Sequence, residues 1–223
     1  MRTPERFFDF GAYQQADMVI KSALKLVSDA HAPAILSMST FESGTRAEES
    51  TRKAHKTTRD AATNPFINLY ENVLLYTENW QEYDVVGISI VGISQIIPGL
   101  TLARMIKEKY PHLHITLGGP IFSVNAGQLI GHPEFFDDFC HSVVTFEGEE
   151  PMHRLLSALK ADDSLSTVPN LLHLDGREVV QNKERVELRF EELPHPDFDG
   201  LPMNKYLSPY PILPVLQSRG CYW

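Results

Sequence analysis

Apolar stretches of strand length alternate with stretches of helical period in the middle of the chain. Asp84–Val91 (DVVGISIV) is a continuous apolar run, the pattern expected of a parallel strand that helices cover on both faces. Leu100–Tyr110 repeats at a helical period, and Leu113–Leu117 is a second apolar run that leads into Gly118-Gly119-Pro120. This order predicts a right-handed strand-helix-strand unit.

The alternation continues to about residue 162. We expect a helix over Ser123–Ile130, a third strand over Ser142–Phe146 and a helix over Glu149–Lys160, which has acids first and lysine last, as the helix dipole favours. The sequence therefore predicts an α/β fold of the Rossmann-like (flavodoxin-like) class: a doubly wound, mainly parallel sheet with helices on both faces.

Different patterns flank this core. Ala12–Ala30 has the spacing of an amphipathic helix, and residues 34–40 indicate a short strand or an extended turn. Residues 42–63 are polar and typical of a solvated helix or mobile loop, and Pro65–Trp80 predicts another helix. After residue 162, Asp175-Gly176 predicts a two-residue β-hairpin turn, and a proline-rich tail follows it.

We accordingly expect four parts. They are an N-terminal helical or irregular extension (1–63), a Rossmann-like domain (64–165), a β-hairpin appendage (166–190) and a proline-rich linker (191–223).

Composition and charge narrow the range of partners. The formal net charge is −9 and lysine and arginine form no long block, which argues against nucleic acid. No run reaches the roughly 18 apolar residues of a membrane span, and the charged N-terminus is unlike a secretory signal, so we expect a cytoplasmic protein. Cys140 and Cys221 give no disulfide framework, and Cys140 beside Phe139 is expected to be a small buried residue.

Three segments meet at the carboxyl edge of the predicted sheet, where ligands of such folds bind. They are Ser89–Pro98, Gly118–Val124 and Phe146–Glu150. Glycines leave backbone exposed to a bulky ligand, and uncharged or acidic side chains supply hydrogen bonds. The candidate binding residues in these segments are Ser89, Val91, Gly92, Ser94, Gln95, Gly118, Gly119, Pro120, Glu147, Gly148 and Glu149. The simpler alternative is that the glycines only turn the chain from strand to helix, and a Gly-Gly pair alone favours that alternative.

A resemblance supports the binding interpretation. The stretch from Asp84 to Pro120 is similar to the cobalamin-binding domains that precede radical S-adenosylmethionine (SAM) domains, whose pattern is Ser-x-aliphatic after one strand and Gly-Gly after the next. Ser89 and Val91 match the first element, and Gly118 and Gly119 match the second. In that family these residues accommodate the nucleotide tail of cobalamin.

Further segments extend the resemblance toward the C-terminus. Thr145–Glu150 (TFEGEE) resembles the family's Gly-Glu-Gly-Glu turn, with Phe146 where glycine is usual, and residues 192–207 resemble its linker. Residues 217–223 (QSRGCYW) resemble the start of a motif whose three cysteines bind a 4Fe-4S cluster, and Cys221 matches the first of them.

The resemblance implies that the chain binds cobalamin and faces a radical SAM domain expected to continue after Trp223. The parent enzyme would also use a 4Fe-4S cluster and S-adenosylmethionine, and would be a methyltransferase or a related radical-based modifying enzyme. The segment alone, with Cys221 as its single expected cluster ligand, is not expected to catalyse the reaction.

Histidine ligation of cobalt is not expected. Many cobalamin proteins use an Asp-x-His-x-x-Gly loop, and the nearest match, Asp29-Ala30-His31, ends in alanine at residue 34 and follows a predicted helix rather than a strand. We expect base-off cobalamin without a protein histidine on cobalt, with Ser94, Gln95 or a bound water near that face. The other histidines show no spacing typical of a zinc site, and we expect them to be surface or hydrogen-bonded residues.

Two other functions remain open. The domain could have lost cofactor binding and act as a docking or substrate-recognition module, an alternative that Phe146 and the missing histidine loop favour. A nucleotide- or flavin-binding domain is the weaker alternative, because no G-x-G-x-x-G follows a strand.

Overall fold

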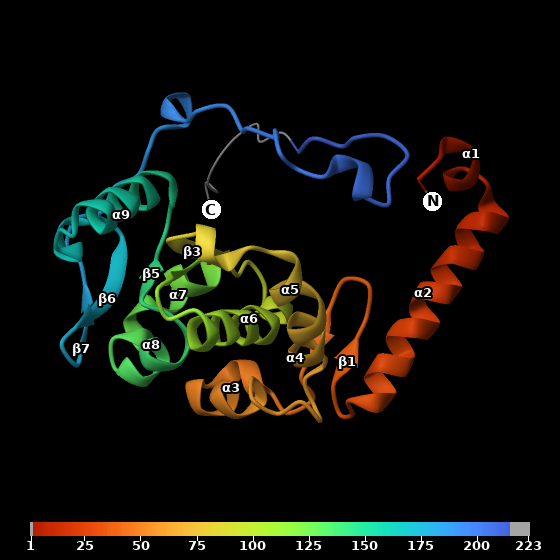
Figure 1. Ribbon diagram of the computed structural model, residues 1–223, viewed down its shortest axis with the longest axis horizontal. Coiled ribbons are helices and arrows are strands. Elements are labelled where there is room, and N and C mark those ends of the chain that lie inside the picture. The colour runs from red at the N-terminus through yellow and green to blue at the C-terminus, as the bar shows by residue number, and fades with distance from the viewer. Residues whose placement is uncertain (1, 215–223) are drawn as a thin grey trace.

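A five-stranded sheet forms the centre of the computed structural model, which describes residues 2–214, with Phe190 described by its backbone alone (Figure 1). The strands follow one another across the sheet in chain order. They are β3 (Val85–Ser89), β4 (His114–Gly118), β5 (Ser142–Val144), β6 (Leu171–Asp175) and β7 (Glu178–Gln181).

Strand direction is mixed. β3, β4 and β5 are parallel, and β6 runs against both of its neighbours, so four of the five strands point the same way. The register pairs Ser89 with Gly118 and Leu117 with Val143. Because side chains alternate across a strand, this register decides which residues share a face.

One face of the sheet is apolar. Ile115, Leu117, Val143 and Leu172 point to it and are 0% exposed. Three helices cover this face and complete the main hydrophobic core. They are α6 (Ile96–Lys109), α7 (Pro120–Leu129) and α8 (Pro133–Phe139), and α8 contributes Phe136 and Phe139, which are both completely buried.

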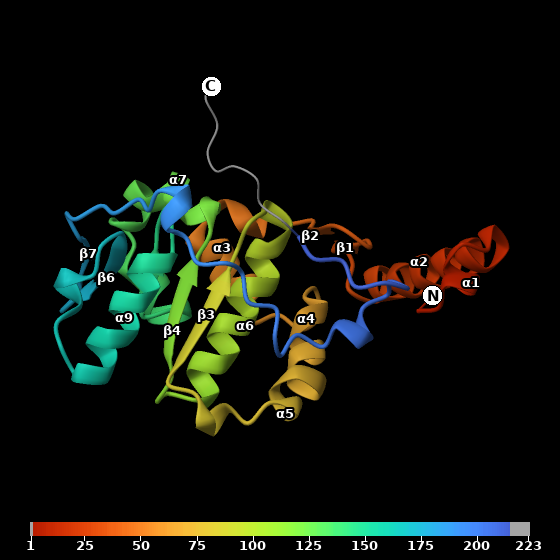
Figure 2. The same cartoon turned by 90° about the horizontal axis from the view of Figure 1, so that it is seen from above.

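The opposite face, here called the second face, has a different composition. Helix α9 (Glu149–Ala161) covers its β5–β6 side, where Leu155 packs with Val144 and Leu171 in a smaller core. Apart from Val85, its β3–β4 side carries small or polar residues, which alternate with the apolar set; they are Gly87, Ser89, His114, Thr116 and Gly118. Figures 1 and 2 place α9 and the segment after β7 on this same side of the sheet.

The part of the chain before β3, which comprises the N-terminal extension and the helical segment that follows it, packs beside α6. It contains a long helix whose start is capped by Asp9, which accepts a hydrogen bond from Ala12 N at 2.6 Å. Buried Asn64 joins the extension to α6 by donating to Thr101 Oγ1 at 2.8 Å. The elements are α1 (Pro4–Phe7), α2 (Phe10–Ala30), β1 (Ile35–Leu36), β2 (Phe41–Glu42), α3 (Thr51–Thr57), α4 (Pro65–Leu69), a π-helical turn (Tyr70–Leu74) and α5 (Leu75–Thr77).

The fold agrees with the sequence in its mixed α/β class and in the positions of most elements, with four differences. The strand order shows no reversal among residues 2–214, so the doubly wound arrangement with a switch point is not found there. The predicted hairpin appendage extends the main sheet instead, because β6 pairs antiparallel with β5. Helix α8 was not predicted, and α6 begins at Ile96, ahead of Leu100, with Pro98 in its first turn.

No helix within residues 2–214 combines the length and apolar character needed to cross a membrane.

Two histidines lie at the amino-terminal end of β4 and β5. His114 Nε2 lies 2.8 Å from Ser142 Oγ, and His141 Nδ1 accepts a hydrogen bond from Ile115 N at 2.9 Å. Burial is the main reason that the pKa of both imidazoles is lowered to about 4, and the charge of Lys107 contributes to both shifts. Both rings are therefore neutral in the folded protein near pH 7.

This pair predicts acid destabilisation. The pKa of each folded histidine lies below its ordinary value of 6.5, so the unfolded chain binds more protons and stability falls as the pH drops from about 6.5 toward 4. We expect a loss of roughly 2 kcal/mol for the pair, allowing for solvent screening of partly exposed rings. Urea unfolding across this range measures it.

The variant His141→Gln keeps an acceptor for Ile115 N but does not titrate, so it should flatten the pH dependence. The matched change His153→Gln, at an exposed position on α9, should leave it unchanged. Equal pH dependence in the native protein and His141→Gln would contradict this account.

Candidate functional site

The candidate site is an open surface on the second face, at the carboxyl ends of β3 and β4. Ser89 and Gly118 lie side by side there because the parallel register pairs them. Ser89 is exposed, and its hydroxyl has no hydrogen-bond partner within residues 2–214. In Figure 2 the arrows of β3 and β4 point toward the same edge, where α7 begins. We call this surface, formed by residues 87–95, 116–120 and 146–149, the crevice, because the ligand crevice of open α/β sheets lies at this edge.

The loop after β3 is held by Gln95. Its Oε1 accepts hydrogen bonds from Val91 N at 2.8 Å and Gly92 N at 3.3 Å. The amide oxygen of Gln95 is therefore used to shape the loop. Ser94 lies in the same short 3₁₀ turn and is half-buried, and its hydroxyl has no partner in the described part of the chain. Val91 projects outward with 60% of its surface exposed.

Gly119 is required by the backbone. It caps α7 with φ at +111°, and a Cβ there would lie 2.3 Å from the carbonyl oxygen of Ile90. Such a contact is far inside the van der Waals limit, and the conformation itself favours glycine. Ile90 N in turn donates to Gly118 O at 2.8 Å, which keeps the two strand ends together. For Gly119, the simpler alternative of a chain-turning glycine is sufficient.

Gly118 is different. A Cβ built on it would meet only Val144 O, at 3.6 Å, which is an ordinary contact. Gly92 has nothing within 4 Å of its Cβ position, and the nearest atom to that of Gly148 is Val144 Cγ1 at 4.0 Å. The fold therefore does not require these three glycines for lack of space. Their missing side chains leave room on the surface of the crevice for a large group, and exposed Pro120 lies beside Gly119 at the first position of α7.

The loop after β5 forms the third side of the crevice. Phe146, predicted to end the strand, instead has φ at +59°, a left-handed conformation that is costly for a bulky residue. A glycine would adopt this conformation without that cost. Phe146 N donates to Ser123 Oγ at 2.6 Å, and the Arg185 guanidinium lies 3.9 Å from the ring centroid.

The acidic candidates in this loop have structural roles. Glu147 Oε2 accepts a hydrogen bond from Leu188 N at 3.0 Å, which fastens the segment after β7 to the loop. Glu149 is exposed in the first turn of α9, where an acidic side chain favours the helix dipole. Gly148 precedes it as the N-cap residue.

Sequence reasoning missed two residues that hold this loop. Ser123 Oγ accepts the hydrogen bond from Phe146 N, and Asn170 Nδ2 donates a hydrogen bond to Glu147 O at 3.3 Å. A lone asparagine before an apolar strand is a weak turn signal, and its partners, distant in sequence, could not be deduced from local pattern.

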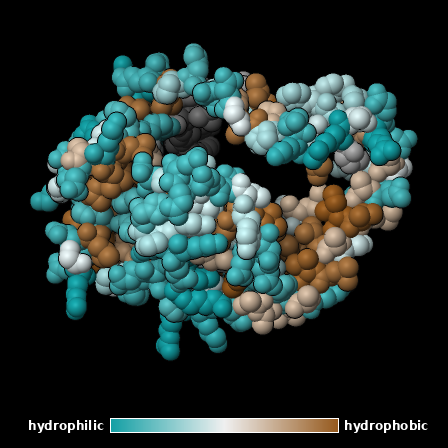
Figure 3. All heavy atoms as spheres, viewed as in Figure 1, coloured by the Kyte–Doolittle hydropathy of each residue, from teal (hydrophilic) through white to brown (hydrophobic). Residues whose placement is uncertain are grey.

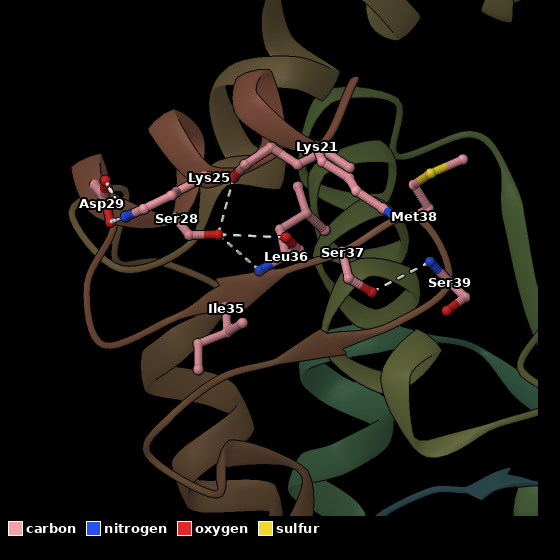
Figure 4. Close-up of a pocket in the computed structure, with 10 residues that line it drawn as sticks. Lys21, Lys25, Ser28, Asp29, Ile35, Leu36, Ser37, Met38 and Ser39 are labelled. Atoms are coloured by element: carbon pink, nitrogen blue, oxygen red, sulfur yellow. Dashed lines mark hydrogen bonds and ion pairs between the residues drawn. The ribbon is translucent and has the colours of Figure 1, made fainter. Parts of the chain in front are cut away.

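A pocket of about 540 Å³ lies elsewhere, between α2 and β1. Figure 4 shows Ser28 aimed at Leu36, where its Oγ accepts a hydrogen bond from the backbone N at 2.9 Å, and Lys25 paired with Asp29 at 2.8 Å. These polar groups therefore form their hydrogen bonds and ion pair with other groups that line the pocket. Hydrophobic residues gather around this region in Figure 3, and Ile35 and Met38 are 56% and 59% exposed. No candidate residue from the sequence lies in the pocket.

Neither the predicted cluster ligand nor His31 is found among the described residues of the crevice. Cys221 lies outside the described residues. His31 ends α2, and its Nδ1 lies 3.2 Å from Ala62 O, in the N-terminal extension rather than at the carboxyl edge of the sheet. Within residues 2–214, no three His, Cys, Asp or Glu side chains are grouped as metal ligands would be. Cys140 is buried, and burial raises the pKa of its thiol.

The chain shows partial sequence similarity to a curated protein. No family model matches. A curated relative, an uncharacterized methyltransferase (PH0819) of Pyrococcus horikoshii, is 28% identical over 140 residues, which are 62% of this chain and 29% of the relative. The chain thus spans less than a third of that relative's length.

Similar solved structures include two of the radical SAM methyltransferase TsrM from Kitasatospora setae. One, with cobalamin and a 4Fe-4S cluster bound, is 20% identical with a TM-score of 0.40 and covers 57% of this chain and 24% of that chain. The other, with tryptophan substrate and a SAM analogue bound, is 18% identical with a TM-score of 0.37 and covers 51% of this chain and 21% of that chain.

The two adjacent glycines should respond differently to alanine. Gly119→Ala introduces a clash with the Ile90 carbonyl at a positive φ, and we expect it to lower the free energy of unfolding by about 2–4 kcal/mol. Gly118→Ala should change it by less than about 1 kcal/mol. Chemical denaturation of both variants measures this, and similar losses for both would contradict the assigned geometry.

Proposed function

We propose that this chain is the cobalamin-binding domain of a radical SAM enzyme of the methyltransferase kind, and that the crevice is its binding surface. The observation that carries the proposal is the pairing of exposed Ser89 with Gly118 at the carboxyl ends of β3 and β4. The likeness in sequence to a curated methyltransferase supports it.

The residues present fit such a cofactor. Gly118, Gly92 and Gly148 leave surface that their Cβ atoms would otherwise fill, as a bulky nucleotide tail requires. The hydroxyls of Ser89 and Ser94 are available to donate hydrogen bonds to carbonyl or phosphate oxygens and to accept them from amide N–H groups. Gly119 and Gln95 act indirectly by holding the backbone of the crevice in place.

Cobalamin, when bound, would supply a cobalt centre that carries a methyl group. The part of this chain is to bind the cofactor and fix its orientation. The radical chemistry is proposed for a neighbouring domain that carries the 4Fe-4S cluster and S-adenosylmethionine, with Cys221 as one cluster ligand. That part of the proposal rests on the resemblance of residues 217–223 to the family's cysteine motif.

The proposal predicts that Gly118→Leu weakens cobalamin binding without unfolding the protein. The added side chain would occupy the surface of the crevice, and we expect affinity for hydroxocobalamin to fall by more than about tenfold. Gly127→Leu is the matched control, because Gly127 lies on the surface of α7 with nothing within 4 Å of its Cβ position. Visible absorption measures binding, and circular dichroism measures folding.

Two results would overturn the proposal. The native protein could fail to shift the spectrum of hydroxocobalamin, or Gly118→Leu could bind as tightly as Gly127→Leu. Binding unaffected by Gly118→Leu would place cobalamin elsewhere, whereas no binding at all would favour the docking-module alternative.

A further inference from the structure

Asn170 connects three parts of the chain that meet behind the crevice. It lies just before β6, is 3% exposed, and has φ at +54°, a left-handed conformation that asparagine tolerates better than most residues. It belongs to none of the three segments that form the crevice.

The backbone of Asn170 holds the end of β5. Its carbonyl accepts hydrogen bonds from Thr145 N at 2.8 Å and Thr145 Oγ1 at 2.9 Å, and its N–H donates to Glu184 O at 3.0 Å. Thr145 is the residue directly before Phe146. The backbone of Asn170 therefore fixes the point at which the crevice loop leaves the sheet.

The side-chain amide of Asn170 forms hydrogen bonds with two separate segments of the chain. Its Nδ2 donates to Val186 O at 2.8 Å and to Glu147 O at 3.3 Å, while Oδ1 accepts from Val186 N at 3.1 Å. One amide thus joins the crevice loop to the segment after β7. Only a side chain that is both donor and acceptor can make this set, because an ionised carboxylate accepts but does not donate.

The same two segments are joined at two further points. Glu147 Oε2 accepts from Leu188 N at 3.0 Å, and Arg185 lies over the ring of Phe146. Of the residues that connect these two segments, Asn170 is buried, and the residues that make the two further contacts are more exposed to solvent. Loss of its two donated hydrogen bonds would leave the partly buried carbonyls of Glu147 and Val186 without that donor, and the loop would relax from its left-handed conformation at Phe146.

We propose that Asn170 is a positioning residue for the cofactor crevice: it sets the position of residues 146–148 without touching the ligand. This inference rests on the proposed function, because the ligand whose affinity it controls is cobalamin. The effect is conformational, and it passes through the hydrogen bonds to Thr145, Glu147 and Val186.

The test compares Asn170→Asp with a matched control, Asn182→Asp. Asn182 also donates two hydrogen bonds to carbonyls, Leu165 O and Val168 O, both at 2.7 Å, but makes none to the crevice loop. Both variants lose two donors, so both should lower the melting temperature. Only Asn170→Asp should weaken hydroxocobalamin binding, by about tenfold.

Two further readouts separate positioning from general stability. Hydrogen exchange should accelerate in residues 145–149 and 184–188 of Asn170→Asp, but not of Asn182→Asp. The cobalamin affinity of Asn170→Asp should also recover toward about pH 5.5, because a buried carboxyl facing carbonyl oxygens becomes protonated and regains a donor. Native protein and Asn182→Asp should show no such recovery.

The outcomes distinguish the two proposals. If the native protein does not bind hydroxocobalamin, the proposed function fails, while faster exchange confined to Asn170→Asp would still support the positioning role. Unchanged exchange in the crevice loop, or equal loss of affinity in both variants, would overturn the positioning role. If Asn170→Asp does not fold, Asn170→Gly, which keeps the left-handed backbone and removes the side chain, is subjected to the same measurements.

Discussion

The parallel register of β3 and β4 places Ser89 beside Gly118, and the candidate site depends on this pairing. Side chains alternate across a strand, so the same register sends Ile115 and Leu117 into the core beneath α6. A shift by one residue would place Ile88 beside Gly118 and expose apolar side chains on the second face. The burial of the apolar set therefore fixes the position of the small and polar set, and packing energy determines the geometry of the crevice.

The glycines of the crevice divide into two kinds. Gly119 is required by the close approach of its backbone to the Ile90 carbonyl, whereas Gly118 lies where a side chain would fit. In the sequence, the two glycines form a single Gly-Gly motif. The structure separates a residue that builds the turn from one that keeps the surface open, and the second kind is more informative about a ligand. Beside them, Phe146 takes a strained backbone conformation that its contacts with Ser123 and Arg185 stabilise.

The sequence predicted what depends on local pattern. The apolar runs gave β3 and β4, the helical periods gave α2 and α9, and the strand ends indicated which segments meet at one edge. The order of strands could not be read in this way, because it depends on pairing between distant segments. The incorporation of β6 and β7 into the sheet was missed for the same reason: a hairpin signal says that two strands pair with each other and not what else they pair with. Asn170 shows the same limit, since its partners lie up to 25 residues away.

The central claim is that the open part of the second face binds cobalamin. Hydrogen exchange of the native protein with and without hydroxocobalamin tests it most directly, because the measurement locates the ligand along the chain. The account predicts slower exchange in residues 87–95, 116–123 and 145–149, and no change around α2 and β1. Protection confined to the pocket between α2 and β1, or no protection at saturating hydroxocobalamin, would contradict it.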